Sequence, residues 1–361
     1  MTRSKLLEAY ADPKLSARLA RVSYVHDDSP GWTRLRHGRS FVYVGEKSKA
    51  LTSPAVLERL DALRIPPAWK EVWIAPSPRA HVQATGVDRV GRKQYIYHAR
   101  WTAFRERMKF FRLAAFAQSL PLLRRRIAKA LREEEFTKSK VAALALSLID
   151  ELAIRVGSDV YARENKTFGV TTLQNRHVVI DDDRITLSFI GKSHQEHELE
   201  LTDTRLAELL LEEQGIPGTR LLQYFDAGGA RHPLTASDVN AFIQEATGGD
   251  FTAKDFRTWI GTVHAYERMR KECSRNVSRE WTSKEYAKSL RGIIKDVAEK
   301  LGNTVAVTKA HYVHAELQKQ YACGAFRRAA RYLRRVKRVP GLSTAESEIL
   351  YVLQKFEKST L

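Results

Sequence analysis

Three isolated basic residues and a late tyrosine are the candidates for chemistry in this chain of 361 residues. Arg155 follows a largely apolar stretch, and Lys192 lies in a tight turn between two predicted strands. Arg257 lies near the start of a predicted helix, and Tyr312 follows all of them. Each has an ordinary explanation by itself, because the arginines can form structural ion pairs, the lysine can be a solvated turn residue and the tyrosine is one of 13. Their meaning therefore depends on the segments around them.

The common motifs of nucleotide and metal chemistry are absent. The chain has no GxxxxGK[ST] phosphate loop, no GxGxxG fingerprint, no HExxH and no DxDxDG loop. The acidic runs at 133–135 and 181–183 lack a suitably spaced histidine or further acid that would complete a metal site. Two cysteines, Cys273 and Cys323, are too few for a disulfide framework or a cysteine-rich zinc or iron–sulfur site. We therefore expect no metal and no cofactor.

The charge of the chain predicts a polyanionic partner. Lys and Arg total 61 against 42 Asp and Glu, which gives a formal net charge of +19. Basic residues concentrate in 99–132 and in 321–340, which contains CGAFRRAARYLRRVKRVP. Most charge runs are solvated faces, but two of them on so basic a chain favour phosphate contact. No stretch reaches the roughly 18 apolar residues of a membrane-spanning helix, and the N-terminal residues MTRSKLLEAYADPKL contain no apolar signal region. We expect a soluble protein of a reducing compartment.

The spacing of apolar residues predicts an α+β chain in two parts. Short aromatic and β-branched runs predict strands at 41–44, 72–74 and 94–97, with a helix at 53–63. Beyond residue 100, three- and four-residue spacing predicts helices at 102–120, 122–135, 139–156, 205–213, 236–246, 259–274, 283–300 and 305–322. Strand patterns at 170–173, 176–180, 184–189 and 196–201 predict a small antiparallel sheet within the helical part. We place a small sheet-rich N-terminal domain at 1–98 and a mainly helical domain at 99–361.

Several long segments, in the same order, resemble one enzyme family. IPPAWKEVWIAPSPRAHVQATGVDRVGRKQYIYH (65–98) is followed by RVGSDVYARENKTFGVTTL, FIGKSHQEHE, KDFRTWIGT and LGNTVAVTKAHY. Together they resemble the type IB DNA topoisomerases of the poxvirus-like and bacterial branch, from about residue 31 to about residue 321. The resemblance implies a catalytic domain like that of tyrosine recombinases and these topoisomerases. It also implies relaxation of supercoiled duplex DNA by transient cleavage of one strand, without ATP or an obligatory metal.

The resemblance assigns the catalytic roles residue by residue. Tyr312 matches the nucleophile, which forms a 3′-phosphotyrosyl bond and releases a 5′-hydroxyl strand. This covalent intermediate conserves the energy of the phosphodiester, so resealing needs no ATP. Arg155 and Arg257 match the arginines that hold the non-bridging oxygens, where an always-charged planar guanidinium suits the charge that builds on phosphorus. Lys192 matches the general acid for the departing 5′ oxygen, and we expect nearby arginines to lower its pKa.

One catalytic position departs from the viral pattern. Asn303 stands where the poxvirus enzymes and many relatives carry a histidine. An amide N–H donates the same kind of hydrogen bond but cannot exchange a proton. Similar bacterial enzymes tolerate Asn here, so the resemblance keeps Asn303 in the catalytic set. His311 and His314 lie nearby as alternative donors, although ordinary surface or packing roles fit them better.

The resemblance also implies how DNA is bound. The domain at 1–98 matches a DNA clamp, or cap, in which Gln94, Tyr95 and Tyr97 form the strand that enters the major groove. On a strand, Tyr95 and Tyr97 share one face and Gln94 lies on the other. Arg105 matches an arginine near the DNA, and Tyr161 matches a phosphate-contacting tyrosine, unless it packs within its helix. The expected partner is double-stranded DNA, bound by a monomer that closes around the duplex, without a membrane. The expected location is the bacterial cytoplasm, at the nucleoid.

Two alternatives remain at this point. A tyrosine site-specific recombinase uses the same chemistry, but it usually carries a histidine three residues before the second arginine, where this chain has Lys254. Its N-terminal arm is helical, unlike the segment at 65–98. A non-catalytic basic DNA-binding protein fits the composition equally well, but it has no need for Tyr312. A covalent protein–DNA adduct distinguishes catalysis from binding.

Overall fold

The computed structural model describes residues 8–10, 12–38, 40–45, 48–275, 280–333 and 335–360. The chain divides into two compact units, Met1–Arg112 and Leu113–Thr360. This division falls inside helix α4 (Ala99–Ala130), which begins where we expected the second domain to begin. The boundary between residues 98 and 99 separates a predicted DNA-clamp domain from a predicted catalytic domain, and it stays a prediction.

The first unit is built on a five-stranded antiparallel sheet. Its order is β2-β1-β3-β4-β5, and its strands are β1 (Trp32–His37), β2 (Ser40–Val44), β3 (Lys70–Ile74), β4 (Val82–Val87) and β5 (Lys93–Tyr97). Helix α3 (Pro54–Ala62) packs Leu60 with Val72 and Ile74 of the sheet. Helix α2 (Pro13–Leu19) and the start of α4 form a second apolar cluster. The strands at 41–44, 72–74 and 94–97 and the helix at 53–63 are thus confirmed.

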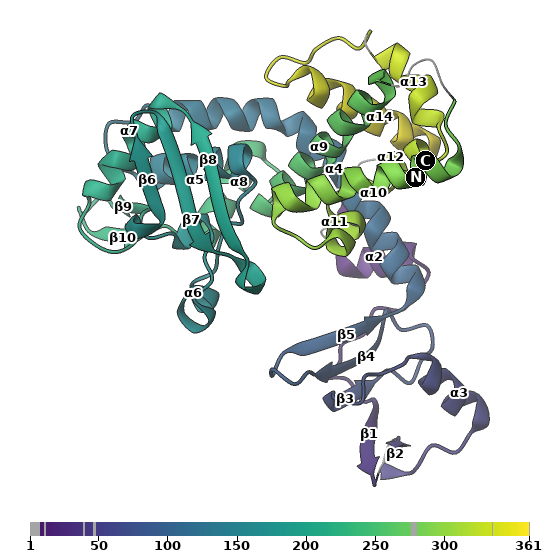
Figure 1. Cartoon of the computed structure of the whole chain (residues 1–361). Helices are drawn as coiled ribbons and strands as arrows, with labels where there is room; N and C mark the ends of the chain where they lie inside the picture. Colours follow the sequence, from purple (N-terminus) through teal and green to yellow (C-terminus); the bar gives the residue numbers. More distant parts are fainter. Residues whose placement is uncertain are drawn as a thin grey trace. The chain divides into compact units, whose positions relative to one another are not determined.

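The second unit is mainly helical, with a small three-stranded antiparallel sheet (Figure 1). Besides most of α4 its helices are α5 (Lys138–Leu152), α6 (Asp159–Asn165), α7 (Thr204–Gly215), α8 (Ala236–Thr247), α9 (Ala253–Arg275), α10 (Ser283–Leu301), α11 (Val305–His311), α12 (Ala315–Ala322), α13 (Ala325–Leu333) and α14 (Thr344–Thr360). The sheet comprises β6 (Val178–Asp181), β7 (Arg184–Ile190) and β8 (Glu196–Thr202), and β9 (Gln223–Phe225) pairs with β10 (Arg231–Pro233). Helix α5 buries most of its residues between 140 and 149 in one large apolar core. The α+β fold class is confirmed.

Four expected elements are wrong in detail: the helices at 102–120 and 122–135, the helix at 305–322 and the strand at 170–173. Helix α4 runs without a break through Pro121, because apolar residues on both sides of the proline, within 113–120 and 123–130, are buried in the same core. This burial offsets the roughly 3 kcal/mol that an internal proline costs. The helix expected at 305–322 is two helices, α11 and α12, and Tyr312 lies at the break with φ −123° and ψ −8°. The strand expected at 170–173 is a 3₁₀ turn, η2 (Val170–Thr172).

The basic run at 321–340 forms α13 and the loop after it. Phe326 and Leu333 of α13 are buried in the core, so the apolar residues of the helix hold it to the unit. Arg334, in the same run, lies outside the described residues. No helix in the described part of the chain is long and apolar enough to cross a membrane.

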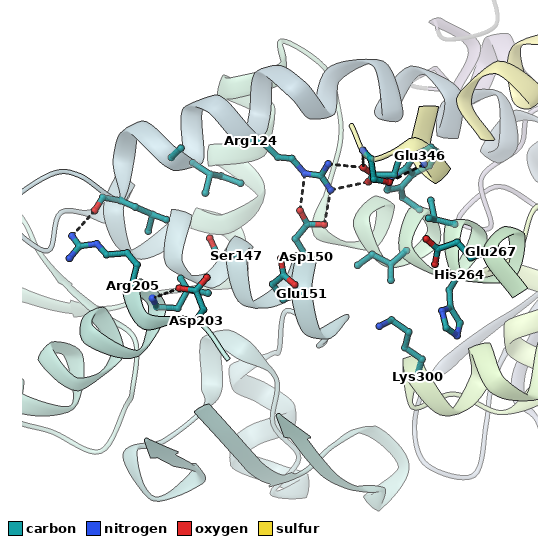
Figure 2. A pocket seen from close by; sticks show the side chains of 18 residues that line it. Arg124, Ser147, Asp150, Glu151, Asp203, Arg205, His264, Glu267, Lys300 and Glu346 are labelled. Atoms are coloured by element: carbon teal, nitrogen blue, oxygen red, sulfur yellow. Dashed lines mark hydrogen bonds and ion pairs between the residues drawn. The ribbon is translucent and has the colours of Figure 1, made fainter. Parts of the chain in front are cut away.

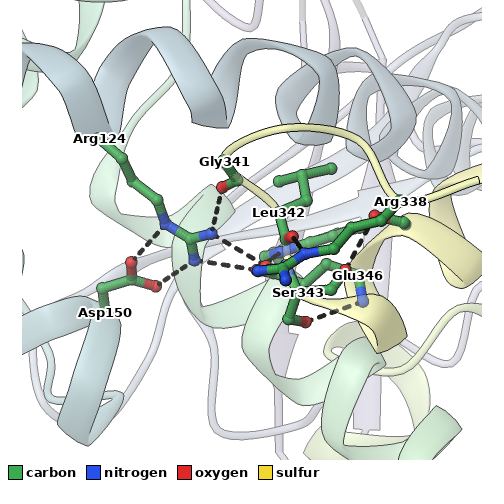
Figure 3. A network of polar contacts seen from close by, with 9 residues as sticks. Arg124, Asp150, Arg338, Gly341, Leu342, Ser343 and Glu346 are labelled. Atoms are coloured by element: carbon green, nitrogen blue, oxygen red, sulfur yellow. Dashed lines mark hydrogen bonds and ion pairs between the residues drawn. The ribbon is translucent and has the colours of Figure 1, made fainter.

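A partly buried charge network joins the C-terminal helix α14 to three other helices (Figure 3). Arg124 of α4 donates to Asp150 of α5 at 3.0 and 3.3 Å, and to Glu346 of α14 at 2.9 Å. Glu346 also accepts a 2.9 Å hydrogen bond from Nε1 of Trp259 on α9. Because α9 also carries Arg257, this network fixes the helix that contributes to the site described below.

We expect the Arg124→Met substitution to lower the free energy of unfolding by about 3 kcal/mol, because it leaves the Asp150 and Glu346 carboxylates buried without their partner. Urea denaturation followed by circular dichroism measures this effect. The matched control is Arg125→Met, since Arg125 is the exposed next residue of the same helix and should change stability by less than about 0.5 kcal/mol. Equal small losses in both variants would contradict a stabilising role for the network.

Candidate active site

Arg155 lies in a short loop just beyond the C-terminus of α5. The helix ends at Ala153, which takes the left-handed conformation with φ 54°. The carbonyl of Arg155 accepts the N–H of Val170 at 2.8 Å, which ties the loop to the η2 turn. Gly169 permits this approach, since a Cβ there would lie 2.5 Å from the carbonyl oxygen of Arg155. The loop after α5 is thus held by backbone contacts and presents the Arg155 side chain.

Arg257 lies on α9 and is 5% exposed. It donates from Nη1 to the carbonyl of Ala153, the C-cap of α5, and from Nη2 to the carbonyl of Leu301, the last residue of α10, at 2.7 Å. Burial and then the charge of Arg155 lower the pKa of Arg257 to about 10, against the opposing effect of Tyr312. It therefore stays protonated at neutral pH.

The two arginines are held by helix C-termini and not by carboxylates. Arg155 donates from Nη2 to the carbonyl of Gly302, the C-cap of α10, and to Oδ1 of Asn303, both at 2.6 Å. The last carbonyls of a helix lack partners within the helix and carry partial negative charge. They stabilise a guanidinium without cancelling its unit charge. In the described part of the chain neither arginine forms an ion pair with an acid, so the structural ion-pair explanation is wrong for both.

Tyr312 lies beside Arg257 because α9 positions both residues. The guanidinium carbon of Arg257 is 5.6 Å from the centre of the Tyr312 ring. One turn further along α9, Gly261 faces the backbone of Tyr312, and a Cβ on this glycine would lie 2.8 Å from the tyrosine carbonyl oxygen. Thr262 donates to that same carbonyl at 3.3 Å. One helix face therefore fixes the tyrosine next to the arginines.

Asn303 is oriented as a hydrogen-bond donor. Its Oδ1 accepts from Arg155, so Nδ2 points elsewhere, and Nδ2 is buried without a hydrogen-bond partner among the described residues. An anion that entered the site would find this N–H group available. The two histidines that were alternative donors have different surroundings. His311 is exposed, and His314 is buried with its ring centre 5.8 Å from that of Phe356 on α14. His314 therefore has the packing role that fits a buried histidine.

Lys192 is the one catalytic candidate whose side chain does not contact the other candidates in the described part of the chain. It lies exposed in η4 (Lys192–His194), the turn between β7 and β8. No hydrogen bond or ion pair joins its ammonium to any described residue. The structure therefore brings Arg155, Arg257, Asn303 and Tyr312 into contact and places Lys192 at the tip of the hairpin.

The DNA-contact candidates occupy different kinds of surface. Tyr95 and Tyr97 are 45% and 43% exposed on one face of β5, with parallel rings 5.7 Å apart. Gln94 lies on the other face, where Nε2 donates to Asp88 at 2.9 Å. Only the two tyrosines therefore present a shared exposed surface.

Arg105 and Tyr161 are the two remaining candidates. Arg105 donates to the carbonyl of Tyr10 at 2.9 Å and to Oγ of Ser16 at 3.2 Å, so it holds the N-terminal segment to α4. Tyr161 is 53% exposed on α6, which is incompatible with a residue packed within its helix. A DNA contact by either residue stays a prediction.

Two hollows in the second unit differ in content. A cleft of about 600 Å³ is lined by charged side chains from several helices, and none of the five catalytic candidates lines it (Figure 2). A cavity of about 10 Å³ is bounded by Arg155, His197, Arg257 and Lys300 together with apolar residues, and it is too small for a cofactor. Within the described ranges, no group of three or more His, Cys, Asp or Glu residues could hold a metal ion.

Comparison with protein families identifies the chain. Residues 98–335 match the catalytic core of eukaryotic DNA topoisomerase I, and residues 40–88 match the N-terminal domain of bacterial DNA topoisomerase IB. The chain belongs to the type IB DNA topoisomerase family. The expected family, fold class and type of enzyme are confirmed. The prediction of a type IB topoisomerase is thereby favoured over a tyrosine recombinase and over a non-catalytic DNA-binding protein.

Individual DNA topoisomerases are also similar to this chain. DNA topoisomerase 1B of Acanthamoeba polyphaga mimivirus is 33% identical over 287 residues, which cover 78% of this chain and 85% of the viral protein. DNA topoisomerase 1B of Vaccinia virus (strain Copenhagen) is 27% identical over 193 residues, which cover 52% of this chain and 54% of the viral protein. DNA topoisomerase 1 of Mycosarcoma maydis is 25% identical over 48% of this chain and 19% of its own length.

Sequence reasoning missed residues that position this topoisomerase site. Gly261 and Thr262 stand in the KDFRTWIGT segment, where only the fold reveals their contact with Tyr312. His197 on β8 could have been found from the sequence. In EHELELT it lies on the same face as Leu199 and Leu201, where the alternating pattern predicts an apolar residue. A histidine at a core-facing strand position is a reason to look for a specific contact.

The buried His314 gives a testable pH dependence. Burial lowers its pKa to about 3 in the folded enzyme, whereas an unfolded histidine titrates near 6.5, so protonation favours the unfolded chain. Stability is therefore lost as the pH falls below about 6.5. Between pH 6.5 and 5 we expect the wild type to lose about 1.5 kcal/mol more than His314→Gln in urea denaturation. His311→Gln, at an exposed histidine, should follow the wild type, and identical pH slopes in all three proteins would contradict the assignment.

Proposed function

We propose that this type IB topoisomerase relaxes supercoiled duplex DNA with Tyr312 as the nucleophile that cleaves and reseals one strand. Family membership supports the reaction class. The observation that carries the residue assignment is the pair of arginines, Arg155 and Arg257, which lie beside Tyr312 and have no carboxylate partner among the described residues. Such uncompensated charges suit a phosphodiester, which carries a negative charge that grows on oxygen in the transition state.

In the proposed cleavage step, Oη of Tyr312 attacks the phosphorus. The Oη–P bond forms as the P–O5′ bond breaks, the phenolic proton passes to solvent and Lys192 gives a proton to the departing 5′ oxygen. Religation is the reverse of this step. The exposed position of Lys192 on a hairpin tip supports this role, because the ammonium is free to approach the leaving strand when DNA is bound.

Arg155, Arg257 and Asn303 would stabilise the non-bridging oxygens. Nε of Arg257 and Nδ2 of Asn303 are buried and have no hydrogen-bond partner among the described residues. Buried donors of this kind are normally satisfied, and preorganised donors aimed at a developing charge contribute strongly to catalysis. The histidine of the viral enzymes is thereby replaced by an amide that donates without titrating.

The remaining assignments concern partner and setting. We propose that one copy of the chain encircles duplex DNA, that Tyr95 and Tyr97 contact it from the first unit, and that Gln94, Arg105 and Tyr161 contribute. The stacked and exposed tyrosines support this interface, since aromatic faces suit contact with nucleic acid. No ATP or metal is required in this scheme. The match of residues 40–88 to a bacterial domain supports a bacterial cytoplasmic setting.

The first test is relaxation of a negatively supercoiled plasmid in EDTA without ATP. We expect full relaxation by the wild type and none by Tyr312→Phe, which keeps the ring beside Arg257 but removes the nucleophilic oxygen. Denaturing gels of labelled duplex should show a covalent adduct with the wild type alone. An adduct formed by Tyr312→Phe would place the nucleophile elsewhere, and retardation without relaxation by either protein would support DNA binding only.

The contact between α9 and Tyr312 predicts the effect of Gly261→Ala. The added Cβ must displace the backbone of Tyr312, and a misplacement of about 1 Å is enough to cost about a hundredfold in rate. We expect adduct formation in a single turnover to slow ten- to a hundredfold, with DNA affinity unchanged. The matched control is Gly292→Ala on α10, where a Cβ meets open space and should stabilise the helix by about 0.5–1 kcal/mol. Wild-type rates in Gly261→Ala would show that α9 does not position the tyrosine.

A further inference from the structure

His197 lies in the site but has no part in the mechanism proposed above. It is half-buried on β8, and its ring stacks on that of Phe189, its register partner on β7, with centres 5.0 Å apart and planes 15° apart. The adjacent Glu196 and Glu198 point to the exposed face of the strand. The histidine is therefore directed inward, toward the arginine cluster.

The free edge of the His197 ring fits between two glycines. A Cβ on Gly191 would lie 2.5 Å from Cδ2 and Nε2 of the imidazole, and a Cβ on Gly302 would lie 2.2 Å from Cε1. Real Cβ atoms do not approach other atoms this closely, so neither position can carry a side chain while the ring stays in place. The ring thus contacts both backbones.

Each of these glycines directly precedes a residue of the site. Gly191 precedes Lys192, and its N–H donates to the carbonyl of Gln195 at 2.7 Å, which closes the turn. Gly302 precedes Asn303, and its carbonyl accepts the 2.6 Å hydrogen bond from Arg155. The imidazole therefore separates the lysine turn from the corner that holds Arg155 and Asn303. On the β7 side, the same turn is held by the N–H of Phe168, which donates to Ile190 at 2.8 Å.

The environment of His197 suits a spacer better than a proton donor. Its Nε2 is buried and has no hydrogen-bond partner in the described ranges. Burial first, and then the charges of Arg155 and Arg257, lower its pKa, so the ring is neutral at pH 7. The cavity of about 10 Å³ that the ring shares with the arginines has no room for a DNA group. The imidazole therefore acts through what it packs against.

We propose that His197 is the positioning residue of Lys192: its ring, clamped between Gly191 and Gly302, sets the distance of the lysine turn from the Arg155–Asn303 corner. It thereby determines how the Lys192 ammonium meets the departing 5′ oxygen. This inference rests on the proposed function. It predicts that loss of the ring impairs proton delivery to the leaving group and leaves stabilisation of the phosphate by the arginines intact.

The test compares single-turnover cleavage of two duplex oligonucleotides at a site mapped with the wild type. One has the natural scissile bond, and the other has sulfur in place of the bridging 5′ oxygen. A thiolate, whose acid has a pKa of about 8.5 in cysteine, leaves without a proton, whereas an alkoxide needs one. A defect in proton delivery should therefore disappear with the sulfur substrate, and a defect in phosphate stabilisation should persist.

We expect His197→Ala to cleave the natural substrate ten- to a hundredfold more slowly than the wild type, with unchanged DNA affinity, and the sulfur substrate within about threefold of it. Lys192→Ala should show the same pattern. His197→Phe, which keeps an aromatic ring in the slot, should stay within about threefold of the wild type on both substrates. The matched control His194→Asn removes an exposed histidine from the same hairpin, and Asn tolerates its positive φ of 56°.

Several results would overturn the proposal. Slow cleavage of both substrates by His197→Ala would assign His197 to the arginine cluster. Equal loss in His197→Phe and His197→Ala would show that an imidazole nitrogen is required. Failure of the sulfur substrate to rescue Lys192→Ala would remove the general acid through which His197 acts. If the wild type forms no adduct with either substrate, the proposed function itself fails, which is a distinct outcome.

A second pair of variants covers the case in which His197→Ala folds poorly. Gly191→Ala should slow natural cleavage ten- to a hundredfold, because its Cβ meets the imidazole. Combining it with His197→Ala removes the ring that it strikes, so the double variant should be no slower than His197→Ala alone. Independent, multiplying losses would contradict a shared contact.

Discussion

The site depends on two guanidinium charges, one buried and one half-buried, that pair with no acid among the described residues. Arg155 and Arg257 donate to the carbonyls at the C-termini of α5 and α10 and to one amide oxygen. A carboxylate in those positions would satisfy the donors equally well but would cancel the charge that a phosphodiester needs. Helix ends supply partial negative charge that is sufficient to hold an arginine and too weak to neutralise it. The geometry of the two helix ends therefore determines the electrostatics of the site.

This arrangement makes the surrounding helices part of the catalytic architecture. Helix α9 carries Arg257 on the face that also contacts the backbone of Tyr312 through Gly261 and Thr262. Its other contacts include the bond from Trp259 to Glu346 of α14, where the acids do pair with an arginine. Carboxylates thus neutralise Arg124 in the supporting network, whereas no carboxylate in the described ranges pairs with the arginines beside Tyr312. The same residue type serves structure in one place and chemistry in the other.

The hairpin of β7 and β8, which carries Lys192 in its turn, is held to the site by backbone and ring contacts and not by the Lys192 side chain. Lys192 is exposed and is linked to the rest of the site through its backbone, with the His197 ring on one side and the Phe168 bond on the other. An acid that protonates the leaving strand must be near the DNA, whereas the arginines must be in place before DNA arrives. Placing the arginines on helix ends and the lysine on a hairpin tip meets both requirements.

Sequence patterns determined much of this protein. The α+β class, most helices, the N-terminal sheet and the small sheet of the second unit followed from apolar spacing. The resemblance of ordered motifs to the type IB topoisomerases predicted the roles of five residues, Arg155, Lys192, Arg257, Asn303 and Tyr312. Periodicity could not show that α4 continues through Pro121, because the core that it buries in is assembled from distant segments. Nor could it show the helix break at Tyr312, which depends on the close approach of α9.

Only the tertiary structure decided what each charged or polar group faces. An arginine in a sequence does not reveal whether it will meet Glu346 or the carbonyl of Leu301, since both partners lie far away along the chain. In the sequence, His197 only interrupts the alternating pattern of a strand. The fold shows that its ring lies against the backbones of Gly191 and Gly302. Residue types and their order are local properties and specify which chemistry is available. Which group balances a charge, and how much space a side chain has, depend on pairs of residues that are distant in the sequence and that only folding brings together.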